Sequence, residues 1–282
     1  MSMVNEGTIT GKLIDIAVKS ETPDYIFAVV TLEVAGGNRI PLELSANPTN
    51  AAGAPSKVYN NFMKFKDSAK TAAAVGLEEA DTISASLASF KENIFSPDGT
   101  AIVNSTQIKG VFFEQKPLAS PTASINVEGI VVSVVDEIVK DVPTGKVIVT
   151  LENVNVFNGK PYTQEFKLKV SEPQNVAFVK TNYTAGSQVT VTVEPRVYEE
   201  TVQVTLAEGA GFGGAITDEK HIFIKEYEIV KGSVPAQPLL DAALLEEGRA
   251  ARQGRIEKAK EKAKNQGSAK PAVKTGTPAF SL

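Results

Sequence analysis

The sequence predicts a mainly β protein made of two similar five-stranded units in tandem, followed by an α-helix and a disordered tail. Three observations support this fold class. Runs of alternating apolar and polar residues recur along residues 5–232, and that alternation is the period of a half-buried strand. The same order of elements occurs twice, on either side of a segment rich in Pro, Ala and Ser. The expected boundaries are 5–116 for the first unit, 117–124 for the linker, 125–232 for the second unit, 239–264 for the helix and 265–282 for the tail.

The first unit reads as three strands, a helix and two more strands. Gly36, Gly37 and Asn38 mark a hairpin turn between the second and third strands. Val58, Phe62, Phe65 and Ala69 recur at helical spacing, and Gly76 stops the helix soon after. The expected strands are 7–16, 25–34, 39–45, 81–90 and 104–113, and the expected helix is 58–74.

The second unit repeats this order with recognisable local matches. Val-Thr-Leu-Glu stands at 30–33 and again at 149–152, and Gly129 occupies the place of Gly11 in the first strand. Asn158-Gly159 is a hairpin dipeptide that matches the turn of the first unit. Several matches in register indicate an internal repeat. The expected strands are 125–134, 146–152, 165–170, 188–194 and 219–229, with a shortened helix at 176–184.

The region after Pro235 differs in composition from both units. It carries nine basic and five acidic residues, a net charge of +4, which leaves −8 for the rest of the chain because the total is −4. Residues 239–264 are rich in helix formers, apolar at the start and charged at the end. Two interpretations are open for the apolar first turn, which consists of Leu239, Leu240, Ala243 and Leu244: it docks on one of the units, or it binds a protein partner. The Arg/Lys-rich remainder could contact a nucleic-acid backbone or only solubilise the tail.

Composition excludes several classes of site. The chain has no Cys and a single His, so thiolate zinc sites, disulfides and His-based catalytic triads are not expected. No cofactor and no metal are expected, and no acid, base and nucleophile stand in a catalytic pattern. The start of the chain lacks the features of a signal peptide and no apolar run is long enough to span a bilayer. A non-enzymatic, cytoplasmic protein is therefore expected, without membrane partners.

The order of strands and helix resembles an OB-fold, the small Greek-key barrel that binds oligonucleotides on the face of its second and third strands. The resemblance covers residues 5–231. Two such units with a charged C-terminal extension are similar to single-stranded DNA-binding proteins, particularly those of phages. The resemblance implies single-stranded DNA as a partner and a role in replication or recombination, with protein partners recruited through the helix and tail. The sequence departs from that family in lacking Trp and in ending Ala-Phe-Ser-Leu without the usual acidic tail.

Strand alternation predicts which side chains face a bound strand. Aromatic rings would stack on bases and basic groups would contact phosphates. In the second strand, apolar residues at 26, 28, 30 and 32 are expected to point inward, which turns Tyr25 and Phe27 outward. Phe212 lies in a Gly-rich loop at 208–214 that could close over a ligand. The candidate nucleic-acid-binding residues are Thr10, Lys12, Tyr25, Phe27, Arg39, Phe90, Lys109 and Phe113 in the first unit, and Lys146, Lys167, Lys169, Arg196, Tyr198 and Phe212 in the second.

Each of these residues also has a structural interpretation. Tyr25 and Phe27 could pack against the linker, the helix or the other unit, and scattered lysines are common on solvated strands. The competing function is a structural or adaptor protein whose acidic body and terminal helix contact other proteins. A hydrolase or transferase ranks third, because no catalytic constellation is visible.

Overall fold

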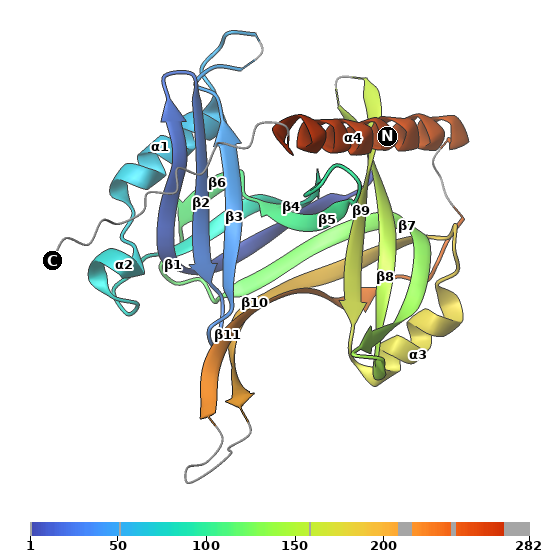
Figure 1. Ribbon diagram of the computed structural model, residues 1–282. Coiled ribbons are helices and arrows are strands. Elements are labelled where there is room, and N and C mark those ends of the chain that lie inside the picture. The colour runs from blue at the N-terminus through green and yellow to red at the C-terminus, as the bar shows by residue number, and fades with distance from the viewer. Residues whose placement is uncertain (1, 51, 158, 208–215, 238–240, 268–282) are drawn as a thin grey trace, which may run out of the picture.

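The computed structural model describes residues 2–50, 52–157, 159–207, 216–237 and 241–267. Within them the protein is mainly β, with one long helix near the C-terminal end (Figure 1). The predicted mainly β fold class with a helix near the C-terminal end is confirmed. The predicted tail from residue 268 onward and Phe212 lie outside the described residues.

The first unit is a ring of paired strands. β1 pairs with β2, β2 with β3, β3 with β5, β5 with β4, and β4 returns to β1. The β3–β5 pair is parallel and the others are antiparallel. This is the Greek-key order expected of an OB-fold-like unit. Its elements are β1 (Asn5–Thr22), β2 (Tyr25–Glu33), β3 (Arg39–Ala46), α1 (Lys57–Ser68), α2 (Ala72–Val75), β4 (Thr82–Phe95), β5 (Val103–Lys109) and β6 (Phe112–Gln115).

The second unit repeats the same ring. β7 pairs with β8, β8 with β9, β9 with β11 in parallel, β11 with β10, and β10 returns to β7. The repeated Val-Thr-Leu-Glu segments supply equivalent core residues, since Val30 and Leu32 in one unit and Val149 and Leu151 in the other are fully buried. The elements are β7 (Thr122–Val139), β8 (Val142–Phe157), β9 (Lys160–Val170), α3 (Pro173–Asn182), β10 (Gln188–Ala207) and β11 (Ile216–Gly232).

The two units share one sheet because their equivalent first strands lie side by side. β1 pairs antiparallel with β7 from Asn5↔Val127 to Thr10↔Thr122. The linker expected at 117–124 is therefore shorter than predicted, since residues from Thr122 onward already pair with β1. This pairing also explains why Thr10 is buried rather than outward: its strand lies between β4 and β7, and its hydroxyl donates to Ser84 Oγ at 3.0 Å.

A backbone irregularity at Leu87 reverses the expected orientation of the second half of β4. Ile83 and Ala85 are buried as predicted, but Leu87 has a φ of 52° and is 48% exposed, and the β1–β4 register shifts there. One extra residue in a strand moves every later side chain to the other face. Phe90 is therefore buried, contrary to the prediction. Its ring lies 5.7 Å from that of Phe166 and 4.9 Å from that of Tyr227, so it joins the cores of the two units.

Two breaks in the chain correct other expected elements of the first unit. The predicted helix at 58–74 is split, because Ala69 is extended and α2 starts only at Ala72. The predicted strand at 104–113 is interrupted after Lys109, and β6 then pairs with the other end of β4. This interruption turns Phe113 into the core, where its ring stacks on Phe65 at 5.1 Å. Phe113 is thus not a surface residue as predicted.

The long helix α4 (Ala242–Gly267) spans both units (Figure 1). It packs mainly on β9 and also contacts β4 and β8. Its apolar side chain Leu245 lies against Met3, Ile130 and Val154. The helix therefore docks on the units, while recruitment of a protein partner stays a prediction. Leu239 and Leu240 of the predicted apolar first turn lie outside the described residues. The helix continues to residue 267, three residues beyond the predicted end.

Candidate nucleic-acid interface

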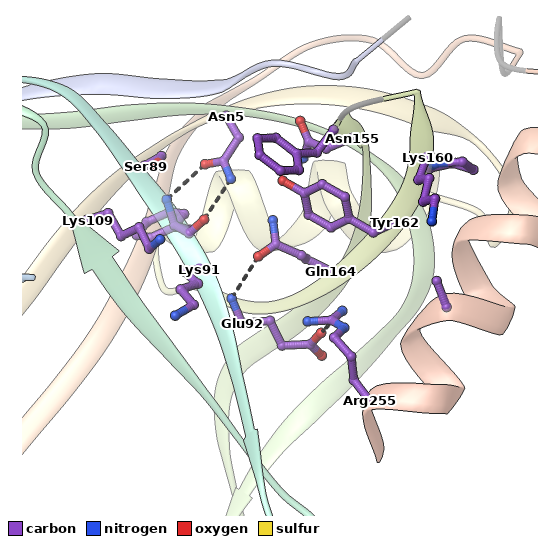
Figure 2. A pocket seen from close by; sticks show the side chains of 14 residues that line it. Asn5, Ser89, Lys91, Glu92, Lys109, Asn155, Lys160, Tyr162, Gln164 and Arg255 are labelled. Atoms are coloured by element: carbon purple, nitrogen blue, oxygen red, sulfur yellow. Dashed lines mark hydrogen bonds and ion pairs between the residues drawn. The ribbon is translucent and has the colours of Figure 1, made fainter. Parts of the chain in front are cut away.

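A cavity of about 750 Å³ lies between the two units, beside α4. We call it the inter-unit cleft. β4 and β5 of the first unit form one wall, and the β8–β9 hairpin of the second unit and α4 form the other (Figure 2). It is lined by Asn5, Ser89, Phe90, Lys91, Glu92, Lys109, Asn155, Phe157, Lys160, Pro161, Tyr162, Gln164, Ala251 and Arg255.

Three lysines give the inter-unit cleft a positive charge. Lys91 and Lys109 come from β4 and β5, and Lys160 comes from the start of β9. In the described parts of the chain none of the three has a carboxylate within ion-pair distance. Burial lowers the pKa of Lys109, and the like charge of Lys91 lowers it further. The two ammonium groups therefore repel each other in the absence of an anion.

The acidic side chains at the cleft are neutralised by α4. Glu92 has a side chain with no exposure, and its carboxylate accepts from Arg252 at 2.6 Å and from Arg255 at 3.1 Å. Asn104 Nδ2 donates to the same carboxylate at 2.7 Å. Arg252 also pairs with Glu165 at 3.0 Å. Because these carboxylates are already paired, the free charges that face the cleft are basic.

Arg255 has one donor left over in the cleft wall. One of its terminal nitrogens reaches both Glu92 and the backbone carbonyl of Thr163. Its Nε is buried and has no hydrogen-bond partner among the described residues. An unmade hydrogen bond from a buried donor is costly.

Aromatic and amide side chains complete the cleft. Tyr162 is half-buried, and burial raises the pKa of its hydroxyl, so the ring stays neutral. Phe157 at the end of β8 is 67% exposed. Asn5 and Gln164 fix the wall, because Asn5 exchanges two hydrogen bonds with the backbone of Phe90 at 2.8 and 2.9 Å, and Gln164 Oε1 accepts from the backbone of Glu92 at 3.1 Å (Figure 2). The arrangement offers ring faces for bases and cations for phosphates on a fixed frame.

The structure leaves some predicted residues at the surface. Tyr25, Arg39, Lys167, Arg196 and Tyr198 are exposed, and Phe27, Lys109 and Lys146 are partly exposed. Of these, only Lys109 lines the inter-unit cleft.

Arg39 and Tyr198 meet instead at a second hollow of about 510 Å³, together with Phe223, which is 76% exposed. There the turn between β2 and β3 contacts β10, because the Asn38 side chain bonds the backbone of Pro195 and Val197 at 3.1 and 2.8 Å. Arg39 pairs with Glu33 at 2.8 Å.

Other predicted residues have their polar groups occupied or their rings buried. Thr10, Phe90 and Phe113 are buried, as described above. Lys169 is buried under β11, and its ammonium group pairs with Glu226 at 2.6 Å and Glu137 at 2.9 Å. Lys12 donates to the carbonyl oxygens of Glu78 and Ala80 at 3.2 and 2.7 Å. Alternation along a strand does not reveal which outward residues a neighbouring strand or loop will cover.

Most of the residues that line the cleft were not predicted from the sequence. Lys91, Phe157, Lys160, Tyr162 and Arg255 were not among the candidates. A signal was available for three of them: Phe157, Lys160 and Tyr162 flank the Asn158-Gly159 hairpin dipeptide, and hairpin tips are exposed. Lys91 was hidden by the register shift at Leu87.

Comparisons with known proteins identify the family. The sequence profile of the YorF family matches residues 4–264, which cover both units and nearly all of α4. The chain belongs to the YorF family. No curated protein matches the sequence. Two crystal structures of the single-stranded DNA binding protein from Thermus aquaticus, the wild type and a deletion mutant, are similar to this YorF family member. For each of the two structures, the sequence identity is 9% and the TM-score is 0.48. The match covers 86% of this chain and 98% of the Thermus aquaticus chain.

Two kinds of feature do not occur in the described part of this YorF family member. No group of three or more His, Cys, Asp and Glu side chains is placed to hold a metal ion. No described helix combines the length and apolar character needed to cross a membrane.

Proposed function

We propose that this protein binds single-stranded DNA in the inter-unit cleft, without reading its sequence and without catalysing a reaction. The observation that carries the proposal is that Lys91, Lys109 and Lys160, all without ion-pair partners in the described chain, line one cleft together with Tyr162. Cations and ring faces in one groove are what a single strand requires, because every base has a π-face and every nucleotide a phosphate.

The cleft favours a strand over a duplex for a geometric reason. Its aromatic side chains, Tyr162 and Phe157, contact a base only if the base is unstacked from its own neighbours. A duplex keeps its bases stacked and paired. The lysines contribute affinity that depends on salt, because each phosphate contact releases counterions from the strand. Exposed single strands arise during DNA replication and recombination, so a role in those processes is part of the proposal.

The test is fluorescence anisotropy of a labelled oligo-dT titrated with the full chain at low and moderate salt. We expect saturable binding that weakens with salt and resists competition by duplex of the same length. The variant Lys91→Gln with Lys109→Gln should bind more weakly, and its plot of log affinity against log salt should be shallower by about 1.4, since each single-strand phosphate contact contributes about 0.7.

The matched control is Lys64→Gln with Lys70→Gln. Both lysines are exposed, and they lie on α1 and just after it, outside the cleft. This control removes the same charge, and its affinity and salt slope should equal those of the wild type. Equal weakening in both variants would show a general charge effect and overturn the cleft as the site. A wild type that does not bind at low salt would overturn the function itself.

A structural or adaptor role is the second candidate, and one surface favours it. The hairpin formed by the ends of β7 and β8 carries four apolar side chains that are more than half exposed: Val135, Ile138, Val139 and Val142. Exposed apolar groups of this kind are typical of protein contacts. If oligonucleotides do not bind, the variant Ile138→Lys with Val142→Lys tests the adaptor role. It should abolish protein contacts and leave the fold intact.

A further inference from the structure

The helix α4 presents three different faces. Leu245, Gly248 and Arg252 face the units, where Gly248 is buried against Thr163 and Arg252 reaches Glu92. Ala251 and Arg255 form a second face that lines the inter-unit cleft. Of the remaining residues, Arg249 reaches the buried Glu152 and Lys264 approaches Gly99, whereas others such as Gly254 are exposed. The 3.6-residue period of the helix determines which residues continue the cleft-lining face beyond Arg255.

The cleft-lining face continues as a row of basic side chains. Residues spaced by three, four or seven positions share one face of a helix, and Lys258 and Lys262 stand seven positions after Ala251 and Arg255. Both are exposed, and neither has an ion-pair partner in the described residues. From Arg255 to Lys262 the helix rises about 10 Å. That length matches about three nucleotides of a stacked strand at 3.4 Å each.

Glu257, Lys260 and Lys264 of this half of α4 point elsewhere. Lys260 pairs with Glu257 at 3.6 Å. Lys260 and Lys264 also approach Gly99 in the loop between β4 and β5. These residues lie on the opposite flank of the helix, and Glu257 is about 200° around the helix axis from Arg255 at 100° per residue. Arg255, Lys258 and Lys262 thus form a basic row. Glu261, three positions after Lys258, lies beside this row, and no ion pair joins the two in the described residues.

We propose that Arg255, Lys258 and Lys262 form a rail that holds the phosphates of a single strand as it leaves the inter-unit cleft. The rail runs along α4 from the second unit toward the β4–β5 loop of the first unit. This inference rests on the proposed function and extends the site from the cleft to the helix. It assigns α4 two roles: Arg249 and Arg252 hold the helix to the units through buried carboxylates, and Arg255, Lys258 and Lys262 contact the ligand.

The rail predicts a dependence on strand length. An oligo-dT of about 6 nucleotides would occupy the cleft alone, whereas one of about 20 nucleotides would also reach the rail. The variant Lys258→Gln with Lys262→Gln should bind the short oligonucleotide as the wild type does. For the long one, its affinity should be weaker and its salt slope shallower by about 1.4, because two phosphate contacts are lost. Gln is a good helix former, so α4 persists.

The matched control lies on the same helix. Lys260→Gln with Lys264→Gln removes the same charge from the opposite flank and should leave binding of both oligonucleotides unchanged. If the Lys258 and Lys262 variant keeps full affinity and salt slope for the long strand while the Lys91 and Lys109 variant loses them, the rail is overturned and the cleft stands. Equal losses in the two α4 variants would also overturn it. A wild type that binds neither length would overturn the rail and the proposed function together.

Discussion

Arg252 of α4 donates to the fully buried carboxylate of Glu92 at 2.6 Å, across 160 positions of sequence. The pair joins α4 to β4 of the first unit, while α4 rests mainly on β9 of the second unit. Arg249 makes an equivalent pair with Glu152 at 2.8 Å. A buried carboxylate without a partner is strongly unfavourable. The helix is therefore a structural strap across both units and not a detachable extension.

The first prediction concerns this strap. Arg252→Met should lower the free energy of unfolding by about 3 kcal/mol, because it leaves Glu92 with fewer compensating charges in a buried site. The measurement is urea unfolding followed by circular dichroism. The control is Lys258→Met, an exposed position on the same helix, for which a change within about 0.5 kcal/mol is expected. Similar stability in the two variants would argue against the strap.

The second prediction compares two glycines of α4. A methyl group at Gly248 would lie 2.7 Å from the Thr163 methyl carbon, whereas a methyl at Gly254 would meet nothing within 4 Å. Gly248→Ala should therefore destabilise the protein by pushing α4 away from β9. Gly254→Ala should stabilise it by up to about 1 kcal/mol, since Ala is the better helix former. Opposite signs in thermal unfolding are the expected result, and a stabilising Gly248→Ala would contradict the close packing.

The third prediction tests stacking in the inter-unit cleft. Tyr162→Phe keeps the ring and should bind oligo-dT nearly as the wild type does. Tyr162→Ala removes the ring and should weaken binding by about 1–3 kcal/mol, the usual contribution of one base stacked on one ring. Melting temperatures of both variants check that the fold is intact. Equal weakening by Phe and Ala would assign the effect to the hydroxyl instead of the ring.

The fourth prediction follows from the lowered pKa of Lys109, caused first by burial and then by Lys91. A bound phosphate favours the ammonium form, so binding takes up a proton wherever Lys109 is neutral in the free protein. Affinity should therefore fall as the pH rises through this lowered pKa. The fall should begin at a lower pH than for an ordinary lysine, whose pKa is about 10.4. Anisotropy with oligo-dC at about pH 7 and about pH 9.5 would show the decline.

The control for this pH dependence is Lys109→Arg. A guanidinium stays charged throughout this range. The variant should therefore lose less affinity than the wild type between the two pH values. An identical decline in both proteins would assign the effect to another group.

Local patterns predicted much of the fold for a physical reason. Alternation placed Ile26, Ala28, Val30 and Leu32 inward, and all four are buried. Where the regular period was interrupted, the prediction was wrong. Leu87 adopts a positive φ and inverts the rest of β4, and the break at Gly110 turns Phe113 inward. The interruption at Leu87 has no local signal, because a bulged Leu is held by the strands on either side of it. Gly110 was a signal for the second interruption, since a glycine inside a strand often marks a break.

The candidate site depended still more on long-range contacts. Strand alternation identified outward side chains such as Tyr25 and Lys167, and both are exposed. It could not show that Lys169 lies under β11 between two carboxylates, or that Lys91 and Lys160, from different units, line one cleft. The roles of Lys91 and Lys160 in binding stay predictions.

The sequence by itself determined the class of fold, the internal repeat and the helix near the C-terminal end, because hydrophobic period and turn residues act over a few positions. The tertiary structure decided how the two units pair through β1 and β7, which carboxylates α4 neutralises, and where free basic groups and rings converge. These are contacts between segments far apart in the chain. Their energies depend on burial and distance, and both exist only once the strands have been brought together.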